Sequence, residues 1–332
     1  MNLRNLLFER GILRQESFPV PVVSVGNLSV DGTGKTPHTE RIASYLSDLL
    51  TTAILSRGYG RQTHGYRIVS PDSTAEEVGD EPLQMACKQV AQIVAVCENR
   101  RKGIRQLLDS HLSPQAIVLD DGFQHRYVER NLDIVLTDYH RLYALDLPLP
   151  AGRLREHKSH ARRAQVIVVT KCPTDLTENE AQSIRNLLQP TDTQRLLFSA
   201  MDYGTPYPMD AADAIPLTPD THVVLLTGIA HAETLEAHCR NAYKTVYSIA
   251  YSDHHRYTEA DLHQVETALA ALPTGKRAIV TTEKDAARLK GHKALSHELR
   301  QHIYIQPIRT EFLFDGWAQM QDLLKKTISA FA

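Results

Sequence analysis

A strand that leads into a glycine-rich loop, at residues 22–36, constrains the fold of this chain more than any other feature. The segment reads VVSVGNLSVDGTGKT, in which an apolar, β-branched run is followed by small residues and then by the expected start of a helix. These elements let backbone N–H groups surround phosphate oxygens. The strict pattern G-x-x-x-x-G-K-[ST] fails at one position, because Ser29 stands where its first glycine is expected.

We interpret this segment as a nucleotide-phosphate loop rather than a glycine turn with an exposed lysine. Lys35 would then reach the β- and γ-phosphates, and Thr36 would hold Mg²⁺. The residues expected to surround the nucleotide are Ser29, Val30, Asp31, Gly32, Thr33, Gly34, Lys35 and Thr36.

The bulk composition is that of a folded protein with more than one core. The chain has 332 residues, of which 42% are apolar and 23% charged, a length that predicts two domains. A formal net charge of -2 excludes a generally basic nucleic-acid binder. The four cysteines, Cys87, Cys97, Cys172 and Cys239, show no C-x-x-C spacing, which argues against a metal site or disulfide framework and favours a reducing compartment.

The N-terminal segment is amphipathic. Residues 1–14 read MNLRNLLFERGILR and place Leu3, Leu6, Leu7 and Phe8 near one helical face, with arginines around its rim. This pattern is typical of a short helix on a membrane surface, and equally of a terminal helix packed on its own domain. No run of 18 apolar residues occurs, so no transmembrane helix is expected.

Short apolar strands alternate with amphipathic stretches along the whole chain, which predicts βαβ units and a parallel sheet. We expect an α/β fold: a P-loop NTPase-like, mostly parallel sheet flanked by helices, with a second, smaller α/β domain. The expected parts are an amphipathic segment at 1–14, a nucleotide-binding and catalytic domain at 15–200 and a cleft-closing domain at 201–332. The predicted strands are 22–25, 52–56, 92–97, 116–120, 133–137, 166–170, 222–227, 246–250, 277–282 and 304–308.

A second candidate site element is the apolar run at residues 116–119, which ends in Asp120 and Asp121. Strands of this form carry the metal-facing carboxylates of phosphate-loop enzymes, so the pair would share Mg²⁺ with Thr36. Gln124 and His125 follow at the same strand end and would add polar groups. An Asp-Asp-Gly turn that binds nothing is the alternative.

Two further clusters contain ionisable side chains. Asp80, in VGDEP, is explained either as a helix N-cap or as the base that accepts a hydroxyl proton. The segment SDHHRYT follows a strand of the second domain, and either His254 or His255 could pair with a carboxylate across the interdomain cleft. A capped helix beginning at Thr258 is the blander interpretation, and the metal motif of a phosphoesterase would need further aspartates that are not found.

Basic residues fill the stretch RLREHKSHARR at 153–163, which fits a solvated helix face or a surface that binds phosphate or lipid headgroups. The loop Ser56-Arg57-Gly58-Tyr59-Gly60 has the form of a ligand loop. Residues 168–173 read VVTKCP and resemble the [NT]-K-x-D loop with which GTPases bind guanine. Pro173 stands where that loop has its aspartate, so guanine specificity is not supported and ATP is the expected nucleotide.

Taken in order, SVGNLSVDGTGKTPHTE, LSRGYGR, VGDEP, VLDDGFQH, LPAGRLRE, YSDHHRYT and TTEKDAAR resemble the tetraacyldisaccharide 4'-kinase family over about residues 20–290. A residue other than glycine at position 29 is normal in that family. The resemblance implies transfer of the ATP γ-phosphoryl group to the 4'-hydroxyl of a tetraacyldisaccharide 1-phosphate, the lipid A precursor. It also implies a peripheral place at the cytoplasmic face of the bacterial inner membrane, with an anionic membrane surface as partner and no obligate protein partner.

The resemblance assigns roles to individual positions. Lys35 and Thr36 match the family's phosphate-loop lysine and metal-binding threonine, Asp120 and Asp121 its paired acids, and Asp80 its proposed base. His254 matches the residue that pairs with this base, with His255 left open. The positions that match motifs lining the nucleotide and lipid cleft are Arg57, Tyr59, Arg155 and Glu156, and we expect these four residues, with Gln124 and His125, to bind the substrate.

In the expected mechanism, His254 pairs with Asp80 only when the interdomain cleft closes.

Two other kinds of protein with different functions also have such a phosphate loop. A membrane-associated P-loop ATPase switch acting on a protein partner would need neither an acceptor base nor a lipid cleft. An ATP-dependent ligase such as dethiobiotin synthetase would not need an amphipathic terminus.

Overall fold

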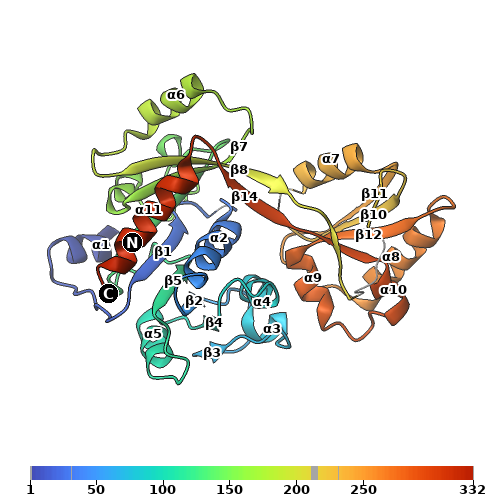
Figure 1. The fold of residues 1–332 in the computed structure, drawn as a ribbon, viewed down its shortest axis with the longest axis horizontal. Coiled ribbons are helices and arrows are strands. Elements are labelled where there is room, and N and C mark those ends of the chain that lie inside the picture. Colours follow the sequence, from blue (N-terminus) through green and yellow to red (C-terminus); the bar gives the residue numbers. More distant parts are fainter. Residues whose placement is uncertain (1, 31, 211–215, 231, 332) are drawn as a thin grey trace.

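The computed structural model describes residues 2–30, 32–210, 216–230 and 232–331. Within these residues the chain forms two sheets, each flanked by helices (Figure 1). The helices are α1 Asn2–Glu9, α2 Lys35–Ser47, α3 Ala75–Val78, α4 Asp80–Cys87, α5 Arg100–Leu108, α6 Glu178–Leu188, α7 Glu233–Ala242, α8 Glu259–Ala271, α9 Glu283–Lys290, α10 His297–Gln301 and α11 Gly316–Ser329, with 3-10 turns η1 Tyr143–Leu145 and η2 Lys158–Arg163.

The larger sheet has the order β14-β8-β7-β6-β1-β5-β2-β4-β3 and is parallel except for its edge strands β14 and β3. Its central strands are rich in Val, Ile and Leu and buried along their length, as strands covered on both faces must be. The strands are β1 Val22–Asn27, β2 Thr52–Ser56, β3 Arg67–Ile68, β4 Ile93–Val96, β5 Ala116–Asp120, β6 Leu132–Asp138, β7 Val166–Cys172, β8 Arg195–Tyr203 and β14 Ile308–Phe312.

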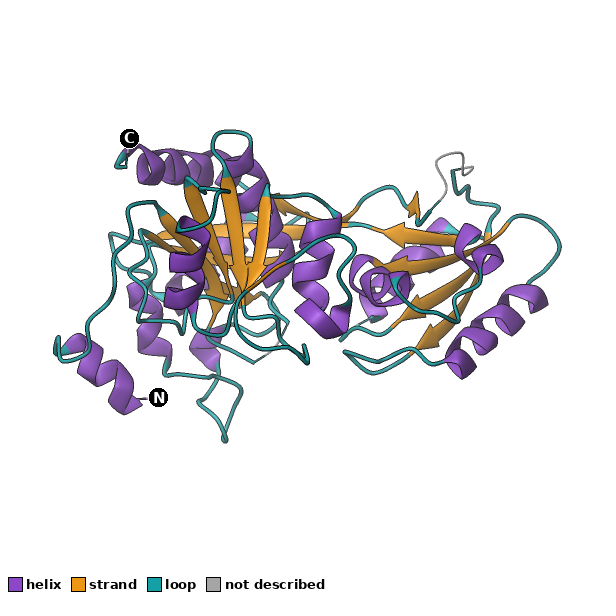
Figure 2. Cartoon of the chain, turned by 90° about the horizontal axis from the view of Figure 1, so that it is seen from below, coloured by secondary structure: helices purple, strands orange, loops and turns teal. Residues whose placement is uncertain are grey.

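Helices cover both faces of this sheet (Figure 2). Ile42 of α2, Leu83 of α4 and Leu324 of α11 share one core cluster with the side chains of β1. Ile104 of α5 belongs to the cluster on the opposite face, and Ile184 of α6 to a further cluster beside β7. The register of β1 places Val25 beside Asp120 of β5, so the loop after β1 and the acids after β5 meet at one edge of the sheet.

The smaller sheet has the order β11-β10-β12-β13-β9 and is parallel apart from β9 at its edge. Its strands are β9 Tyr207–Pro208, β10 His222–Thr227, β11 Thr245–Ala250, β12 Arg277–Thr282 and β13 Ile303–Gln306. Two core clusters, one on each face, show that it packs as its own unit. The α/β class with a large, mostly parallel sheet and a second, smaller sheet is therefore confirmed.

The division between the two units differs from the expected boundaries at 200 and 332. Strand β8 runs to Tyr203 and pairs with β14, and α11 packs back on the large unit, so the last residues return to the larger sheet. The predicted strand 304–308 is wrong at its end, because Pro307 separates β13 from β14. The smaller unit thus lies between β8 and β14, and two antiparallel strands connect it to the larger one (Figure 1).

Helix α1 packs on the large unit. Asn5 is buried and donates to Glu156 Oε2 at 2.8 Å, and its carbonyl accepts from Arg126 at 3.0 Å. Phe8 is also buried and contacts the ring of Tyr127 edge-on. Leu6 and Ile12 remain exposed, and the side chain of Leu3 lies outside the described residues. Among the residues described, every helix is too short or too polar to cross a bilayer.

Candidate active site

The phosphate loop follows β1 and is fixed at its base. Gly34 adopts φ 77°, a left-handed conformation that favours glycine, and directly precedes α2. Thr33 is buried: its hydroxyl accepts from Asn27 Nδ2 at 2.8 Å and its carbonyl accepts from Thr170 Oγ1 at 2.9 Å. The loop therefore has a rigid base on β1 and β7. Asp31, which was expected to belong to the loop, lies outside the described residues.

Arg155 connects this loop to the acids after β5. Its guanidinium donates to the carbonyl of Ser29 at 2.9 Å, to Asn27 Oδ1 at 2.8 Å and to Asp121 Oδ2 at 2.9 Å. It also reaches Gln124 Oε1 at 3.2 Å. The planar guanidinium has several donors in one plane, so it can hold these acceptors in a fixed arrangement.

The two acids after β5 have different surroundings. Asp120 is buried and accepts hydroxyl hydrogen bonds from Thr39 at 3.2 Å and Ser56 at 2.9 Å. Burial and the neighbouring charge of Asp121 raise the pKa of Asp120 to about 6. Burial would also raise the pKa of Asp121, but the positive charges of Lys35 and Arg155 hold it below its ordinary value. Lys35 Nζ lies 3.9 Å from Asp121 Oδ1.

These groups fit a magnesium ion by their chemistry. Asp120, Asp121 and Thr36 offer oxygen donors only, which Mg²⁺ prefers, and such an ion is commonly held by one or two carboxylates together with substrate phosphates. Thr36 is half-buried, and Thr39 one turn later is the residue that contacts Asp120. Within the described residues no group of three or more His, Cys, Asp or Glu side chains is placed to hold a metal alone.

Two glycines bring Asp80 next to Tyr59. Gly58 and Gly79 have φ of 69° and 92°, and a Cβ added to either would collide with the backbone of the other's loop. The loop at 57–60 consequently packs against the start of α4, where Asp80 lies. Tyr59 is 67% exposed, and its ring centroid is 5.5 Å from that of His254.

Asp80 receives two partners from the smaller unit. His254 Nδ1 lies 3.0 Å from Asp80 Oδ2, and Arg288 of α9 donates to the same oxygen from Nε at 2.9 Å and Nη2 at 2.7 Å. Burial would raise the pKa of Asp80, but the hydrogen bonds from His254 and Arg288 lower it to about 2. Beside them, Lys284 lies 3.1 Å from Glu81 and 3.2 Å from Asp253.

His254, and not His255, is the histidine placed against Asp80. His255 turns into its own unit, where Nε2 lies 2.9 Å from Asp261 Oδ2 and the ring stacks on Tyr251. His254 has φ 60°, an uncommon conformation for a residue with a side chain. The pair with Asp80 is already formed in this structure, whereas the sequence predicted it only on closure.

The remaining candidates are placed as follows. Gln124 is buried and donates to the carbonyl of Asn27 and to Glu156 Oε1, and Glu156 is buried with Arg163 at 3.0 Å, so both are committed to protein contacts. His125 is half-buried, and burial with nearby positive charge lowers its pKa to about 3. Arg57 is exposed. Val30, on the phosphate loop, is half exposed.

Sequence reasoning missed Arg100, Thr39 and Arg288, and it placed Ser56 in a ligand loop without its contact with Asp120. Arg100 is buried behind the acids, donates to the Asp120 carbonyl at 3.2 Å, and has its pKa lowered to about 10 by burial, so it stays charged. Thr39 lies three residues after Thr36, a helical spacing that would have placed it on the same face. Arg288 stands in the TTEKDAAR stretch, to which no role was assigned.

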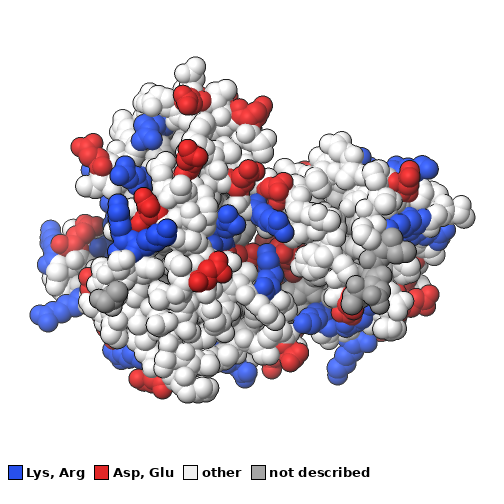
Figure 3. All heavy atoms as spheres, in the orientation of Figure 1, with Lys and Arg blue, Asp and Glu red and all other residues white. Residues whose placement is uncertain are grey.

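Charged side chains gather where the two units meet (Figure 3). Lys88, which directly follows α4, lies 2.6 Å from Glu40 of α2 and 2.7 Å from Glu283 of α9. The two acids are buried and Lys88 is half-buried, and together they link the helix that follows the phosphate loop to the helix that carries Arg288.

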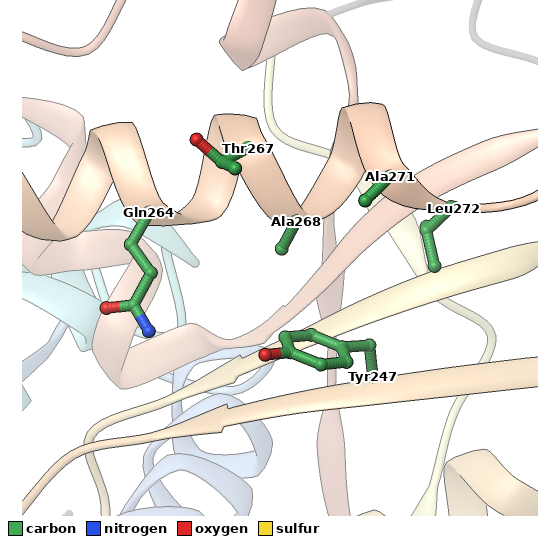
Figure 4. Close-up of a pocket in the computed structure, with 6 residues that line it drawn as sticks. All are labelled: Tyr247, Gln264, Thr267, Ala268, Ala271 and Leu272. Carbon is green, nitrogen blue, oxygen red and sulfur yellow. The ribbon is translucent and has the colours of Figure 1, made fainter.

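The smaller unit has a separate hollow of about 350 Å³ between β11 and α8. Figure 4 shows Tyr247 of β11 below α8, with the side chains of Gln264 and Ala268 pointing towards it. Tyr247 is the one ionisable side chain among the lining residues, and none of the predicted site residues lies there. The hollow therefore has no part in the phosphate chemistry.

A phosphate loop at the end of a central parallel strand, with two acids after its neighbour, defines a nucleotide-binding enzyme of the P-loop class. Comparison with known proteins narrows this class: the family model described as Tetraacyldisaccharide-1-P 4'-kinase, LpxK, matches residues 1–329. The chain belongs to this family, as its motifs predicted, and is a kinase of lipid A biosynthesis.

Individual relatives agree along the whole chain. The Tetraacyldisaccharide 4'-kinase of Phocaeicola vulgatus is 41% identical, with 99% of this chain and 90% of the relative covered. That of Bacteroides thetaiotaomicron is 43% identical, with 94% and 86% covered. A crystal structure of the "apo" form of LpxK from Aquifex aeolicus in complex with ATP matches with a TM-score of 0.75 at 28% identity, covering 98% of this chain and 94% of that one.

Proposed function

We propose that this chain transfers the γ-phosphoryl group of ATP to the 4'-hydroxyl of a tetraacyldisaccharide 1-phosphate, and that Asp80 accepts the hydroxyl proton. The observation that supports this most is the contact of Asp80 with His254 across the two units. The charge of Glu81, the residue after Asp80, contributes to the raised pKa of Asp120.

The phosphate loop and its helix would bind the nucleotide phosphates. Lys35 would neutralise charge on the transferring group, and the backbone N–H groups after Gly32 would orient it. Thr36, Asp120 and Asp121 would hold Mg²⁺, which would offset negative charge on the phosphate groups. Arg155 keeps the loop and Asp121 in register, and its place among Asn27, Ser29 and Asp121 supports a positioning role.

Asp80 is ionised throughout the neutral range, because its pKa is lowered to about 2. His254 and Arg288 both donate to Oδ2, so we assign Oδ1 as the atom that receives the proton. His254 would hold the carboxylate in position as the acceptor hydroxyl approaches. Tyr59, exposed beside His254, together with Arg57 and His125, would contact the acceptor sugar or its phosphate.

We further propose that the protein works as a peripheral enzyme at the cytoplasmic face of the bacterial inner membrane. The exposed Leu6 and Ile12 of the N-terminal segment would contact the anionic lipid surface, while Asn5 and Phe8 hold the segment on the enzyme. In this proposal, one set of residues in the segment contacts the membrane and another set packs on the enzyme.

One experiment tests the reaction. The protein is incubated with γ-labelled ATP, Mg²⁺ and a lipid A disaccharide precursor dispersed in detergent, and the lipid is separated by chromatography. Label in the lipid is expected. Release of labelled inorganic phosphate alone would instead favour the ATPase switch, and would overturn the kinase assignment.

A further inference from the structure

Three leucines project from a turn next to the phosphate loop. Leu145, Leu147 and Leu149 are 70%, 57% and 54% exposed, at alternate positions of the segment 145–150, which we call the leucine loop. Exposed leucines are common one at a time, but three at alternate positions on one turn form an apolar tip that water solvates poorly. The loop has no part in the phosphate or proton chemistry described above.

Backbone hydrogen bonds build this turn. The N–H of Leu154 donates to the Leu147 carbonyl and that of Leu149 to the Leu154 carbonyl, each at 2.9 Å. Asp146 accepts from the N–H groups of Leu147 and Arg153 at 2.8 and 3.2 Å. A side chain at Gly152 would collide with the Leu147 carbonyl, so the turn requires glycine there. The outward position of the leucines is thus a built feature of the loop.

Positive charge surrounds the apolar tip. Between residues 141 and 163 the acids are Asp146 and Glu156, and the side chains of both are mostly or wholly buried, at 13% and 1% exposure. The exposed charges of this stretch are cations, Arg141, Arg153, Lys158 and Arg162. The whole chain carries a formal charge of -2, so this local excess is a property of the segment. An apolar tip flanked in sequence by exposed cations is complementary to an anionic bilayer, with the leucines among the acyl chains and the cations at the headgroups.

The leucine loop also lies against the nucleotide site. Ser29 and Leu154 form an antiparallel bridge, and the N–H of Val30 donates to the Arg153 carbonyl at 3.0 Å. Lys158 donates to the carbonyl of Ala144, the residue before the leucine loop. A bilayer that receives the loop would therefore lie beside the phosphate loop, where a lipid acceptor can present its sugar while its acyl chains stay in the membrane.

We propose that the leucine loop is a second membrane-contact element, separate from the N-terminal segment, and that it inserts into an anionic lipid surface. This inference rests on the proposed lipid-kinase function. It commits to a lipid bilayer as the occupant of the surface, because charge complementarity and closeness to the phosphate loop both favour it.

Vesicle sedimentation tests the proposal. The full-length protein is mixed with vesicles of phosphatidylethanolamine and phosphatidylglycerol, and its bound fraction is compared with that of the triple variant Leu145→Ser/Leu147→Ser/Leu149→Ser. We expect binding to weaken by about tenfold or more, since apolar burial and anionic attraction act together. A matched pair of single variants, Leu147→Ser and Leu49→Ser, compares the loop with a similarly exposed leucine elsewhere; Leu147 is 57% exposed and Leu49 47%. The second is expected to bind like the wild type.

Two results would overturn the proposal. The first is that the triple variant binds vesicles as strongly as the wild type. The second is that light scattering shows a wild-type dimer and a monomeric triple variant, in which case the loop is a self-association surface. Activity on acceptor dispersed in detergent checks folding and is expected to stay within about twofold of wild type, because the loop is outside the chemistry. If the wild-type protein phosphorylates no acceptor in detergent, the proposed function fails; if it does and only the vesicle result is negative, this inference alone fails.

Discussion

Arg288 and Asp80 form a two-bond ion pair across the junction of the two units, with Nε and Nη2 of Arg288 at 2.9 and 2.7 Å from one carboxylate oxygen. A charged, planar donor of this kind fixes the orientation of a carboxylate and stabilises its ionised form. The smaller unit thus sets both the direction and the protonation of a residue that belongs to the larger one.

Replacing this arginine should change the pH dependence of turnover. The folded-state pKa of Asp80 lies at about 2, below its ordinary value of 3.8, so the ion pair stabilises the folded protein above about pH 4 and this stabilisation is lost as pH falls towards 2. In Arg288→Met the pKa of Asp80 should rise by roughly one unit or more. The acid limb of the kcat/KM profile should then lie about one pH unit higher in Arg288→Met than in wild type, which a profile between about pH 3 and 5 would show. Arg288→Lys should restore part of the difference; an acid limb that is the same in all three proteins contradicts the assignment.

Removing the proposed base should affect chemistry more than nucleotide binding. Asp80→Asn keeps the size of the side chain but cannot take a proton, so kcat should fall about 10²-fold or more. The KM for ATP should change little. Glu76→Gln, a nearby exposed acid on α3, is the matched control and should behave as wild type. Near-normal kcat in Asp80→Asn would exclude Asp80 as the base.

Replacing His254 should mainly lower kcat, whereas replacing His255 should mainly lower the unfolding temperature. His254→Gln loses the contact with Asp80, and we expect kcat to fall by at least about tenfold at unchanged thermal stability. His255→Gln loses Asp261 and the stacked Tyr251, so its main effect should be a lower unfolding temperature of the smaller unit. Calorimetry together with steady-state kinetics measures both. The opposite pattern would assign the pairing role to His255.

Magnesium dependence should respond to the acids after β5. Chelation with EDTA should abolish turnover, and added Mg²⁺ should restore it. Asp121→Asn should raise the Mg²⁺ concentration needed for half-maximal rate by about tenfold, because one oxygen ligand loses its charge. A magnesium titration of each variant, with Asp109→Asn as a distant control, gives the comparison. If the titration curves of Asp120→Asn and Asp121→Asn match wild type, the acids do not hold the metal.

The N-terminal segment should contribute to membrane contact without affecting the nucleotide. Leu6→Ser/Ile12→Ser removes its exposed apolar groups and keeps the buried Asn5 and Phe8. Binding to phosphatidylglycerol vesicles should weaken by severalfold, since less apolar area enters the interface. ATP affinity should remain that of wild type. Unchanged sedimentation would leave α1 with a packing role only.

Much of the fold was accessible from the sequence because it depends on local patterns. Strands β2, β5, β10 and β12 begin and end where the runs of Val, Ile and Leu predict. The sequence missed the strands β3, β8, β9 and β14, and of these β8 and β14 pair with each other across more than a hundred residues of chain. Neither local propensity nor periodicity reports which distant strand supplies the partner, so the return of the chain to the large sheet could not be predicted.

The site also contains residues that local motifs predict and residues that only the tertiary structure reveals. Lys35, Asp120 and Asp121 stand in motifs whose spacing carries the chemistry, and the family assignment made from those motifs is confirmed. Arg155 was expected among the residues that line the nucleotide and lipid cleft. That role stays a prediction, and the structure adds its contacts with Ser29 and Asn27. Arg100 and Arg288 depend on tertiary placement alone, because a buried arginine beside a carboxylate looks in sequence like any surface charge.

The connection between the units limits how they can move. Strand β8 pairs with β14, Gly204 donates its N–H to the Pro307 carbonyl at 3.0 Å, and β9 then pairs with β13, so two strands run side by side from one sheet to the other. The connection therefore consists of two paired strands and not of one flexible segment. A flexible linker samples many end-to-end distances, so a paired connection restricts the relative positions of the two units more strongly. The connection thereby keeps His254 within reach of Asp80.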